Sequence, residues 1–162
     1  MNTKVAVKDA FLHAIEIEKL GAALYGKLEE KSSQDILKKI FNKLKKAETF
    51  HIEKFQQLYQ LLESEANERG ISLTGGGNET EILKDKVFNR VQSLQQLINA
   101  QSPYELLNHL VNLELDVINY YTHLQHFILP KEQQFLMKII NEEKDHVKEL
   151  IRERNRFKKS SM

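Results

Sequence analysis

The chain has 162 residues, of which 41% are hydrophobic and 29% charged, and its formal net charge is +1. This length suits one domain with its own core, and the near-neutral charge gives no reason to expect nucleic acid or an anionic membrane as a partner. The absence of cysteine excludes disulfides, thiolate zinc sites and thiolate-ligated iron. No apolar run approaches the ~20 residues of a membrane span, and charges interrupt the N-terminal segment where a signal peptide would be apolar. We therefore expect a cytoplasmic protein.

The first half of the chain predicts two long helices, over residues 4–30 and 34–66. Both carry apolar residues three and four positions apart, a spacing that places them along one side of a helix. Ser32 and Ser33 lie between the helices, where a serine can cap the second helix, and Asp35 falls in its first turn. This turn is short, so the two helices should be antiparallel neighbours.

A long connection follows, over residues 67–101. It contains Gly70 and the run Gly75–Gly77, and a segment around 80–100 that could form an extra helix. A connection of this length lets the helices on either side of it run parallel, as a crossover and not as a hairpin.

The second half predicts two further helices, over 103–128 and 131–157. Ser102–Glu105 has the sequence of a capping box with proline at the first helical position, and Pro130 opens the last helix after a short turn. The sequence therefore predicts a single all-α domain over residues 1–162, built as a four-helix bundle.

The two halves repeat one two-helix unit. A shift of 96 residues relates Glu18 to Glu114 and Tyr25 to Tyr121. A shift of 95 relates the later residues of the unit, which are Glu48 and Glu143, and His51 and His146. A repeated hairpin with a pseudo-two-fold axis indicates a closed bundle and not a solenoid.

Each apolar stripe is interrupted only by glutamate or histidine. The interruptions are Glu18, Glu48, His51, Glu114, Glu143 and His146. A single glutamate at such a position can reach water at the edge of a stripe. The four glutamates, however, lie at similar numbers of residues from the turns, which places them in one layer of the bundle. Four carboxylates in one interior layer would be very unfavourable without positive charge.

Metal ions would supply that charge. The pairs Glu48/His51 and Glu143/His146 are Glu-x-x-His motifs, and residues three apart share one face of a helix. One glutamate from each of two helices, with a Glu-x-x-His motif from each of the other two, is the ligand set of di-iron and di-manganese bundles. We therefore predict two Fe ions as cofactors, with Mn as the alternative because it accepts the same ligands.

The segments Ala14–Tyr25 (AIEIEKLGAALY) and Lys46–His51 (KAETFH) resemble the rubrerythrin-like branch of the ferritin superfamily. The resemblance covers all four main helices. It implies a ferritin-like fold with di-iron ligation by the six residues above, and it implies that Glu48 and Glu143 bridge the two metals. Members of this family reduce peroxide or oxidise ferrous iron with oxygen, and by analogy a homodimer is expected.

The chain departs from the rubrerythrin pattern in two ways. Val117 stands where rubrerythrins carry a second glutamate, so the predicted site is closer to the symmetrical six-ligand centre of bacterioferritins. The rubredoxin domain is missing, so peroxidase turnover would need an external electron-donor protein.

Tyr25 and Tyr121 each follow a predicted ligand glutamate by seven residues, or two helical turns. They could serve only in packing. The alternative, which the resemblance favours, is that each hydroxyl donates to a ligand carboxylate across the bundle and fixes its orientation.

Other polar residues near the motifs have ordinary explanations. His13 and His109 lie one position off the stripe, and His123 and His126 are expected on a partly exposed face. The carboxylates that flank the ligands are expected to be solvated charges; they are Glu16, Asp116, Glu142 and Asp145.

Three functions follow from this pattern. The leading hypothesis is a non-haem di-iron oxidoreductase that reacts with hydrogen peroxide or dioxygen, as a rubrerythrin-like peroxidase or ferroxidase. The second is an iron-binding or buffering protein without sustained turnover. The third is a metal-free helical module for interaction with another protein.

Overall fold

The computed structural model describes residues 7–69, 78–99, 102–128 and 130–160. Within these ranges the chain forms five α-helices and one short 3₁₀ helix, and no strand is present among them, which confirms the all-α prediction. The elements are α1 (Val7–Lys31), α2 (Asp35–Arg69), α3 (Asn78–Leu97), α4 (Pro103–Leu124), η2 (Gln125–Phe127) and α5 (Pro130–Ser160).

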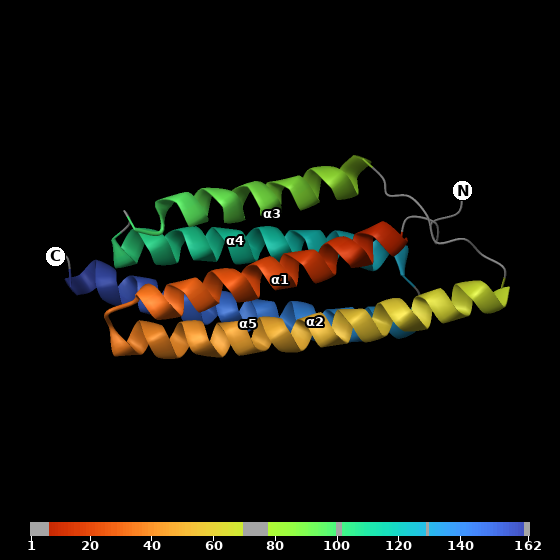
Figure 1. The fold of residues 1–162 in the computed structure, drawn as a ribbon, viewed down its shortest axis with the longest axis horizontal. Helices are drawn as coiled ribbons and strands as arrows, with labels where there is room; N and C mark the ends of the chain where they lie inside the picture. The colour runs from red at the N-terminus through yellow and green to blue at the C-terminus, as the bar shows by residue number, and fades with distance from the viewer. Residues whose placement is uncertain (1–6, 70–77, 100–101, 129, 161–162) are drawn as a thin grey trace.

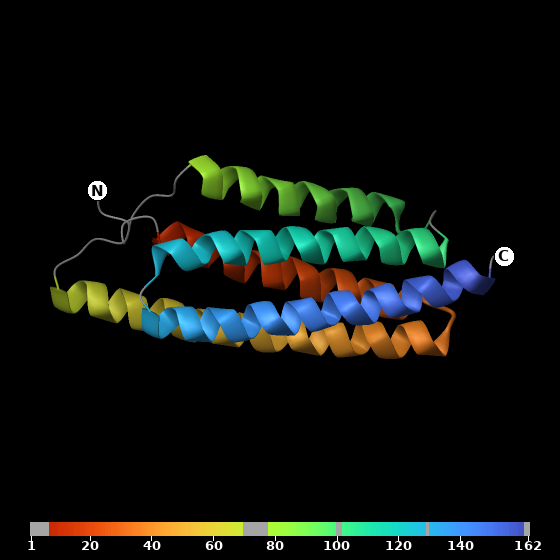
Figure 2. The same ribbon diagram turned by 180° about the vertical axis from the view of Figure 1, so that it is seen from behind.

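Four of the helices form two antiparallel hairpins that lie side by side. α1 packs against α2 and α4 packs against α5, while contacts between α1 and α4 and between α2 and α5 join the hairpins. Figures 1 and 2 show that α2 and α4 run in the same direction, because α3 carries the chain back along the bundle between them.

The local signals in the sequence explain where the elements begin and end. Ser102 is the N-cap of α4, its hydroxyl accepts a hydrogen bond from the backbone N–H of Glu105, and Pro103 takes the first helical position. The helix predicted to reach residue 128 ends at Leu124, and the chain continues as the 3₁₀ turn η2 before α5 begins at Pro130.

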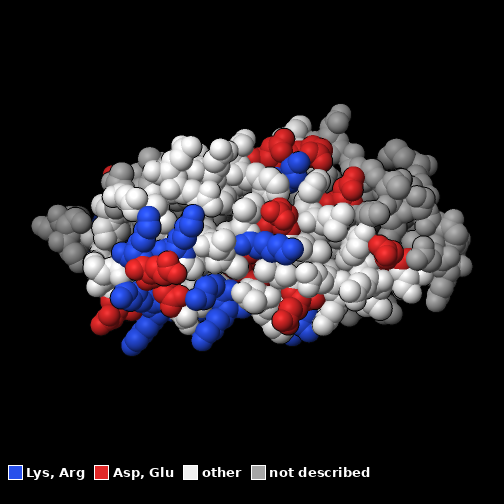
Figure 3. Space-filling view, in the orientation of Figure 1, with Lys and Arg blue, Asp and Glu red and all other residues white. Residues whose placement is uncertain are grey.

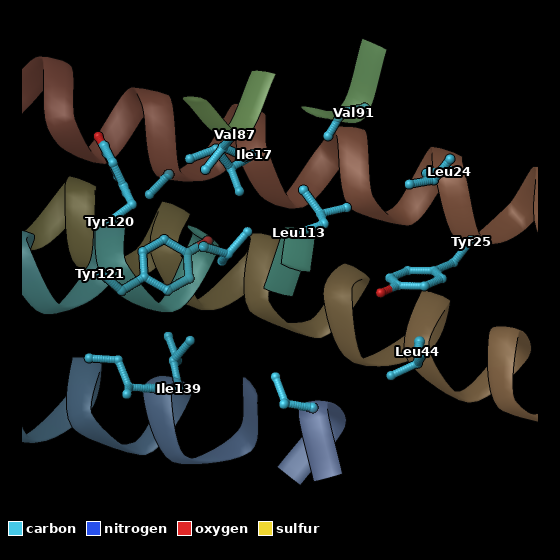
Figure 4. Packing of buried hydrophobic residues seen from close by; sticks show 14 of the residues in the cluster. Ile17, Leu24, Tyr25, Leu44, Val87, Val91, Leu113, Tyr120, Tyr121 and Ile139 are labelled. Atoms are coloured by element: carbon cyan, nitrogen blue, oxygen red, sulfur yellow. The ribbon is translucent and has the colours of Figure 1, made fainter. Parts of the chain in front are cut away.

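The extra helix predicted in the crossover corresponds to α3, which contacts α4 and α1. Figure 4 shows Val87 and Val91 of α3 reaching toward Ile17 of α1 and Leu113 of α4, and all four side chains are buried. The glycine run of the crossover, Gly75–Gly77, lies outside the described residues.

Polar contacts tie the elements together around this core. Arg90 of α3 donates from Nε to Oδ2 of Asp116 of α4 at 2.5 Å, and Lys86 lies 3.6 Å from the same carboxylate. The hydroxyl of Tyr120 donates to the backbone carbonyl of Ala10 at 2.8 Å, which joins α4 to α1. Asp116 was expected to be solvated, and this expectation is wrong because α3 covers it: the residue is 7% exposed.

The outer surface mixes charges of both signs. In the face shown in Figure 3, lysine and arginine gather toward the α1–α2 turn, but acidic side chains lie among them. Lys45, for example, pairs with Glu29 at 2.7 Å, and Lys43 pairs with Glu149 of α5 at 3.1 Å. No helix among the described residues has the length and apolar character needed to cross a membrane.

Candidate metal centre

The six residues predicted as ligands come together inside the bundle. α1 contributes Glu18, α2 contributes Glu48 and His51, α4 contributes Glu114, and α5 contributes Glu143 and His146. Each of the six is buried, and the most exposed, His146, retains only 7% of its surface. The helical register of the two hairpins therefore places four carboxylates and two imidazoles in one interior layer.

The cluster divides into two overlapping groups whose ligand atoms lie within 4.8 Å of one another. The first group is Glu18, Glu48, His51 and Glu143, and the second is Glu48, Glu114, Glu143 and His146. Glu48 and Glu143 belong to both groups. Each group could hold a metal ion, and two ions so placed would share these two carboxylates.

Two tyrosines support the outer carboxylates across the bundle. The hydroxyl of Tyr25 donates to Oε1 of Glu114 at 2.6 Å, and the hydroxyl of Tyr121 donates to Oε1 of Glu18 at 2.7 Å. Both tyrosines are fully buried, and in Figure 4 their hydroxyls point toward each other along the bundle. Each hairpin thus orients a carboxylate that belongs to the other.

The two histidines face the carboxylates through their Nδ1 atoms. Nδ1 of His51 lies 2.9 Å from Oε1 of Glu143 and 3.4 Å from Oε1 of Glu18. Nδ1 of His146 lies 3.3 Å from Oε2 of Glu143 and 4.0 Å from Oε1 of Glu48. The ring centroids are 6.2 Å apart. Nδ1 is therefore the nitrogen that each histidine can offer to a metal.

Several atoms of the cluster are buried without a hydrogen-bond partner. These atoms are Oε2 of Glu18, Oε1 of Glu48, Nδ1 of His51 and Oε1 of Glu143. His51 and Glu143 are close, but their atoms lack the alignment of a hydrogen bond. Unsatisfied buried acceptors are costly, and these four all point into one region. Carboxylate oxygen and imidazole nitrogen are ligands that iron and manganese accept, so the residues present fit a pair of such ions.

The proton affinities of the cluster reflect its crowded negative charge. Burial, with the nearby Glu143 carboxylate, raises the pKa of Glu48 and of Glu114 well above the ordinary value. Burial also opposes ionisation of Glu143, but its contacts with Glu114, His146 and His51 outweigh burial and lower its pKa. For His51 burial lowers the pKa, yet the carboxylates of Glu143 and Glu18 prevail and raise it to about 11. Without a metal, the cluster balances its charge with protons.

Comparisons with protein-family models, with curated proteins and with solved structures found no match for this chain. Any assignment of function therefore depends on the geometry of the cluster itself.

One residue beside the cluster was not expected from the sequence. Oε2 of Glu142 lies 2.6 Å from Nε2 of His51, although Glu142 had been expected to be a solvated charge. That expectation is wrong in this respect, because Glu142 precedes a ligand on α5 and the packing of α2 on α5 brings His51 to it. Its side chain remains 37% exposed, so it joins the buried histidine to the surface.

A glycine also shapes the cluster. A Cβ atom at Gly21 would lie 3.0 Å from Oε2 of Glu48, so the absence of a side chain there leaves room for this carboxylate. The spacing of apolar residues in the sequence gives no sign of this close approach.

The remaining candidate residues lie outside the cluster. His13 and His109 are partly buried, His126 is exposed, and Nε2 of His123 lies 3.2 Å from Oγ1 of Thr80. Burial, followed by the positive charge of Lys84, lowers the pKa of His13. Glu16 and Asp145 are exposed, in agreement with the expectation that they are solvated.

Proposed function

We propose that this chain is a ferritin-like di-iron protein, and that it acts as a non-haem oxidoreductase toward hydrogen peroxide or dioxygen. The observation that carries the proposal is the pair of overlapping groups, in which four buried carboxylates and two imidazoles converge and Glu48 and Glu143 are shared. This arrangement has the composition of a two-metal carboxylate centre in a helical bundle.

The charge of the ligand set supports two divalent ions. Four ionised carboxylates offset two ions of charge +2, and neutral imidazoles add no charge. Glu18 and His51 would hold one ion and Glu114 and His146 the other, with Glu48 and Glu143 between them. Mn would be accepted by the same oxygen and nitrogen atoms.

When bound, two ferrous ions would supply two electrons, enough to reduce hydrogen peroxide to water or dioxygen to peroxide. The protein holds the ligands in place and keeps bulk water away. Tyr25 and Tyr121 fix the orientation of Glu114 and Glu18 through their hydroxyl protons, and the buried layer lies between apolar side chains such as Phe55 and Leu44.

Sustained turnover requires electrons from outside the chain. The sequence has no cysteine, so it carries no thiolate-ligated iron to serve as an internal donor. We propose an external electron-donor protein as a partner, a homodimer as the assembly and the cytoplasm as the location.

Metal analysis followed by anaerobic Fe(II) titration tests the proposal. We expect saturation near two ions per chain, and Glu48→Ala or His146→Ala should abolish it. Glu53→Ala is the matched control, since Glu53 is an exposed carboxylate of the same helix. A folded protein that binds no metal, with the same stability in the Glu48 and His146 variants, would overturn the proposal.

Mixing the Fe(II)-loaded protein with peroxide or dioxygen then distinguishes an enzyme from an iron buffer. Repeated oxidation in the presence of a reductant supports the oxidoreductase. A single oxidation of about two irons per chain that cannot be repeated supports iron binding and buffering, the second candidate, which the absence of cysteine from these 162 residues favours.

A further inference from the structure

His51 is held from both sides of its ring. Nδ1 faces the carboxylates of Glu143 and Glu18, and Nε2 lies 2.6 Å from Oε2 of Glu142. A carboxylate can only accept a hydrogen bond, so Nε2 carries the proton and donates it. Because Nε2 keeps its proton, a metal ion that displaces the proton at Nδ1 finds there a lone pair directed at the cluster.

The second histidine has no such support. The 95-residue shift that relates His51 to His146 relates Glu142 to Ala47, whose methyl group cannot accept a hydrogen bond. The contacts of His146 with carboxylates pass through Nδ1, and in the part of the chain that the structure describes no hydrogen bond reaches its Nε2. The repeat is therefore broken at the position behind the imidazole.

A carboxylate behind a ligating histidine has two effects on metal binding. It fixes the tautomer and the ring orientation, and it makes the opposite nitrogen a stronger donor to the metal. On this basis we propose that Glu142 is a positioning residue that makes the two metal positions unequal, with the position formed by Glu18 and His51 the tighter one. The inference rests on the proposed function, since it requires that both groups bind metal.

The position of Glu142 makes it suitable for mutation. Its side chain is 37% exposed while His51 is buried, so replacing it leaves no internal cavity. Asp145, three residues further along α5, is an exposed carboxylate adjacent to His146. Asp145→Ala therefore removes one negative charge from the same helix without touching the ring of His51.

A titration with Co(II), monitored by calorimetry and by visible absorption, tests the inference. The wild type should bind two ions with unequal affinity. Glu142→Ala should weaken the tighter step about 10–100-fold, which brings the two steps together. Glu142→Gln keeps a hydrogen-bond acceptor and should recover part of this loss, and Asp145→Ala should behave as the wild type. Far-UV circular dichroism checks that each variant is folded.

A second measurement reports on the hydrogen bond directly. In the Co(II)-loaded protein each ligated imidazole contributes one exchangeable N–H proton with a strongly shifted NMR signal. We expect one of these protons to exchange slowly in the wild type and both to exchange rapidly in Glu142→Ala, because only the proton of His51 is held by a carboxylate.

The outcomes separate this inference from the proposed function. Two-ion binding that Glu142→Ala leaves unchanged, with no change in proton exchange, overturns the inference while the proposed function stands. Failure of the wild type to bind Co(II) or Fe(II) overturns both.

Discussion

The hairpins α1–α2 and α4–α5 carry the same ligand types at matched positions but have different surroundings. Their common features are the outer glutamates and the tyrosines, which bond reciprocally: Tyr25 to Glu114 and Tyr121 to Glu18. These features meet at the centre of the bundle, where four negative charges must be balanced.

The differences lie one layer further out. Glu142 stands behind His51, but Ala47 takes the matching position relative to His146. Gly21 leaves space beside Glu48, whereas the 96-residue shift relates Gly21 to Val117. The comparison teaches that the repeat is kept in the ligands and in the two tyrosines that bond across the bundle, and is lost at Glu142 and Gly21.

The largest expected effect comes from replacing the two shared carboxylates, Glu48 and Glu143, one at a time. Burial and neighbouring carboxylates raise the pKa of Glu48, so its charge destabilises the metal-free fold, whereas the contacts of Glu143 with Glu114 and the two histidines lower its pKa. Glu48→Gln should therefore raise the free energy of unfolding of the metal-free protein. Glu143→Gln should lower it by about 3 kcal/mol.

Urea denaturation at neutral pH, in the presence of a chelator, measures this difference. Both variants should lose the stabilisation that metal confers on the wild type, because each residue belongs to both groups. If both substitutions changed the free energy of unfolding of the metal-free protein by the same amount and in the same direction, the two carboxylates would be equivalent.

A smaller effect is expected from filling the space beside Glu48. A Cβ atom in Gly21→Ala would press on Oε2 of this carboxylate, so both metal affinities should fall about tenfold. Alanine favours a helix over glycine by about 1 kcal/mol, so the variant should remain folded. Val117→Ala is the counterpart in the other hairpin: it should cost about 1–3 kcal/mol of stability and leave metal binding unchanged. Calorimetric titration of both variants with metal measures whether affinity falls in Gly21→Ala and stays unchanged in Val117→Ala.

The tyrosine hydroxyls should contribute less to metal binding. Tyr25→Phe and Tyr121→Phe each remove one hydrogen bond to a carboxylate, worth about 1.5–3 kcal/mol when the acceptor is charged. We expect both variants to retain two metals but to react more slowly with peroxide or dioxygen in stopped-flow measurements. Tyr120→Phe is the matched control, because its hydroxyl bonds to the backbone carbonyl of Ala10 and not to the cluster. If all three variants react with peroxide or dioxygen at the wild-type rate, Tyr25 and Tyr121 serve only in packing.

The smallest effect is expected at the ion pair that joins α3 to α4. Asp116 accepts a hydrogen bond from Arg90, while the 96-residue shift relates Asp116 to Leu20, which cannot form such a bond. Asp116→Asn should cost roughly 0.5–1 kcal/mol, with no change in metal stoichiometry. A change in stoichiometry would mean that α3 influences the cluster and does not merely cover the bundle.

Much of the fold could be predicted because its signals are local. The 3–4 spacing of apolar residues marks the helices, and the capping sequence at Ser102 sets the start of α4. The six clustered residues were predictable because glutamate and histidine stand out in apolar stripes and recur in both halves of the chain.

The surroundings of the cluster could not be predicted in the same way. Glu142 precedes Glu143 and points away from it on a helical wheel, and only the packing of α2 on α5 brings it to His51. The burial of Asp116 depends on where α3 lies, and nothing in the spacing of its apolar residues specifies which groove it fills. Such contacts arise from the rotation of one helix against another, which a single sequence does not encode locally.

The placement of α3 gives the molecule a front and a back. Figures 1 and 2 show α3 along α4 and α1, on the long side opposite to α2 and α5. On that side α3 therefore adds a layer of protein between the metal cluster and solvent. On the other side only the thickness of the bundle itself separates it from solvent, and there the carboxylate of Glu142 already reaches from the surface to a buried ring. Under the proposed function, the shortest path for electrons to the cluster therefore runs through the side formed by α2 and α5, because α3 covers the opposite side.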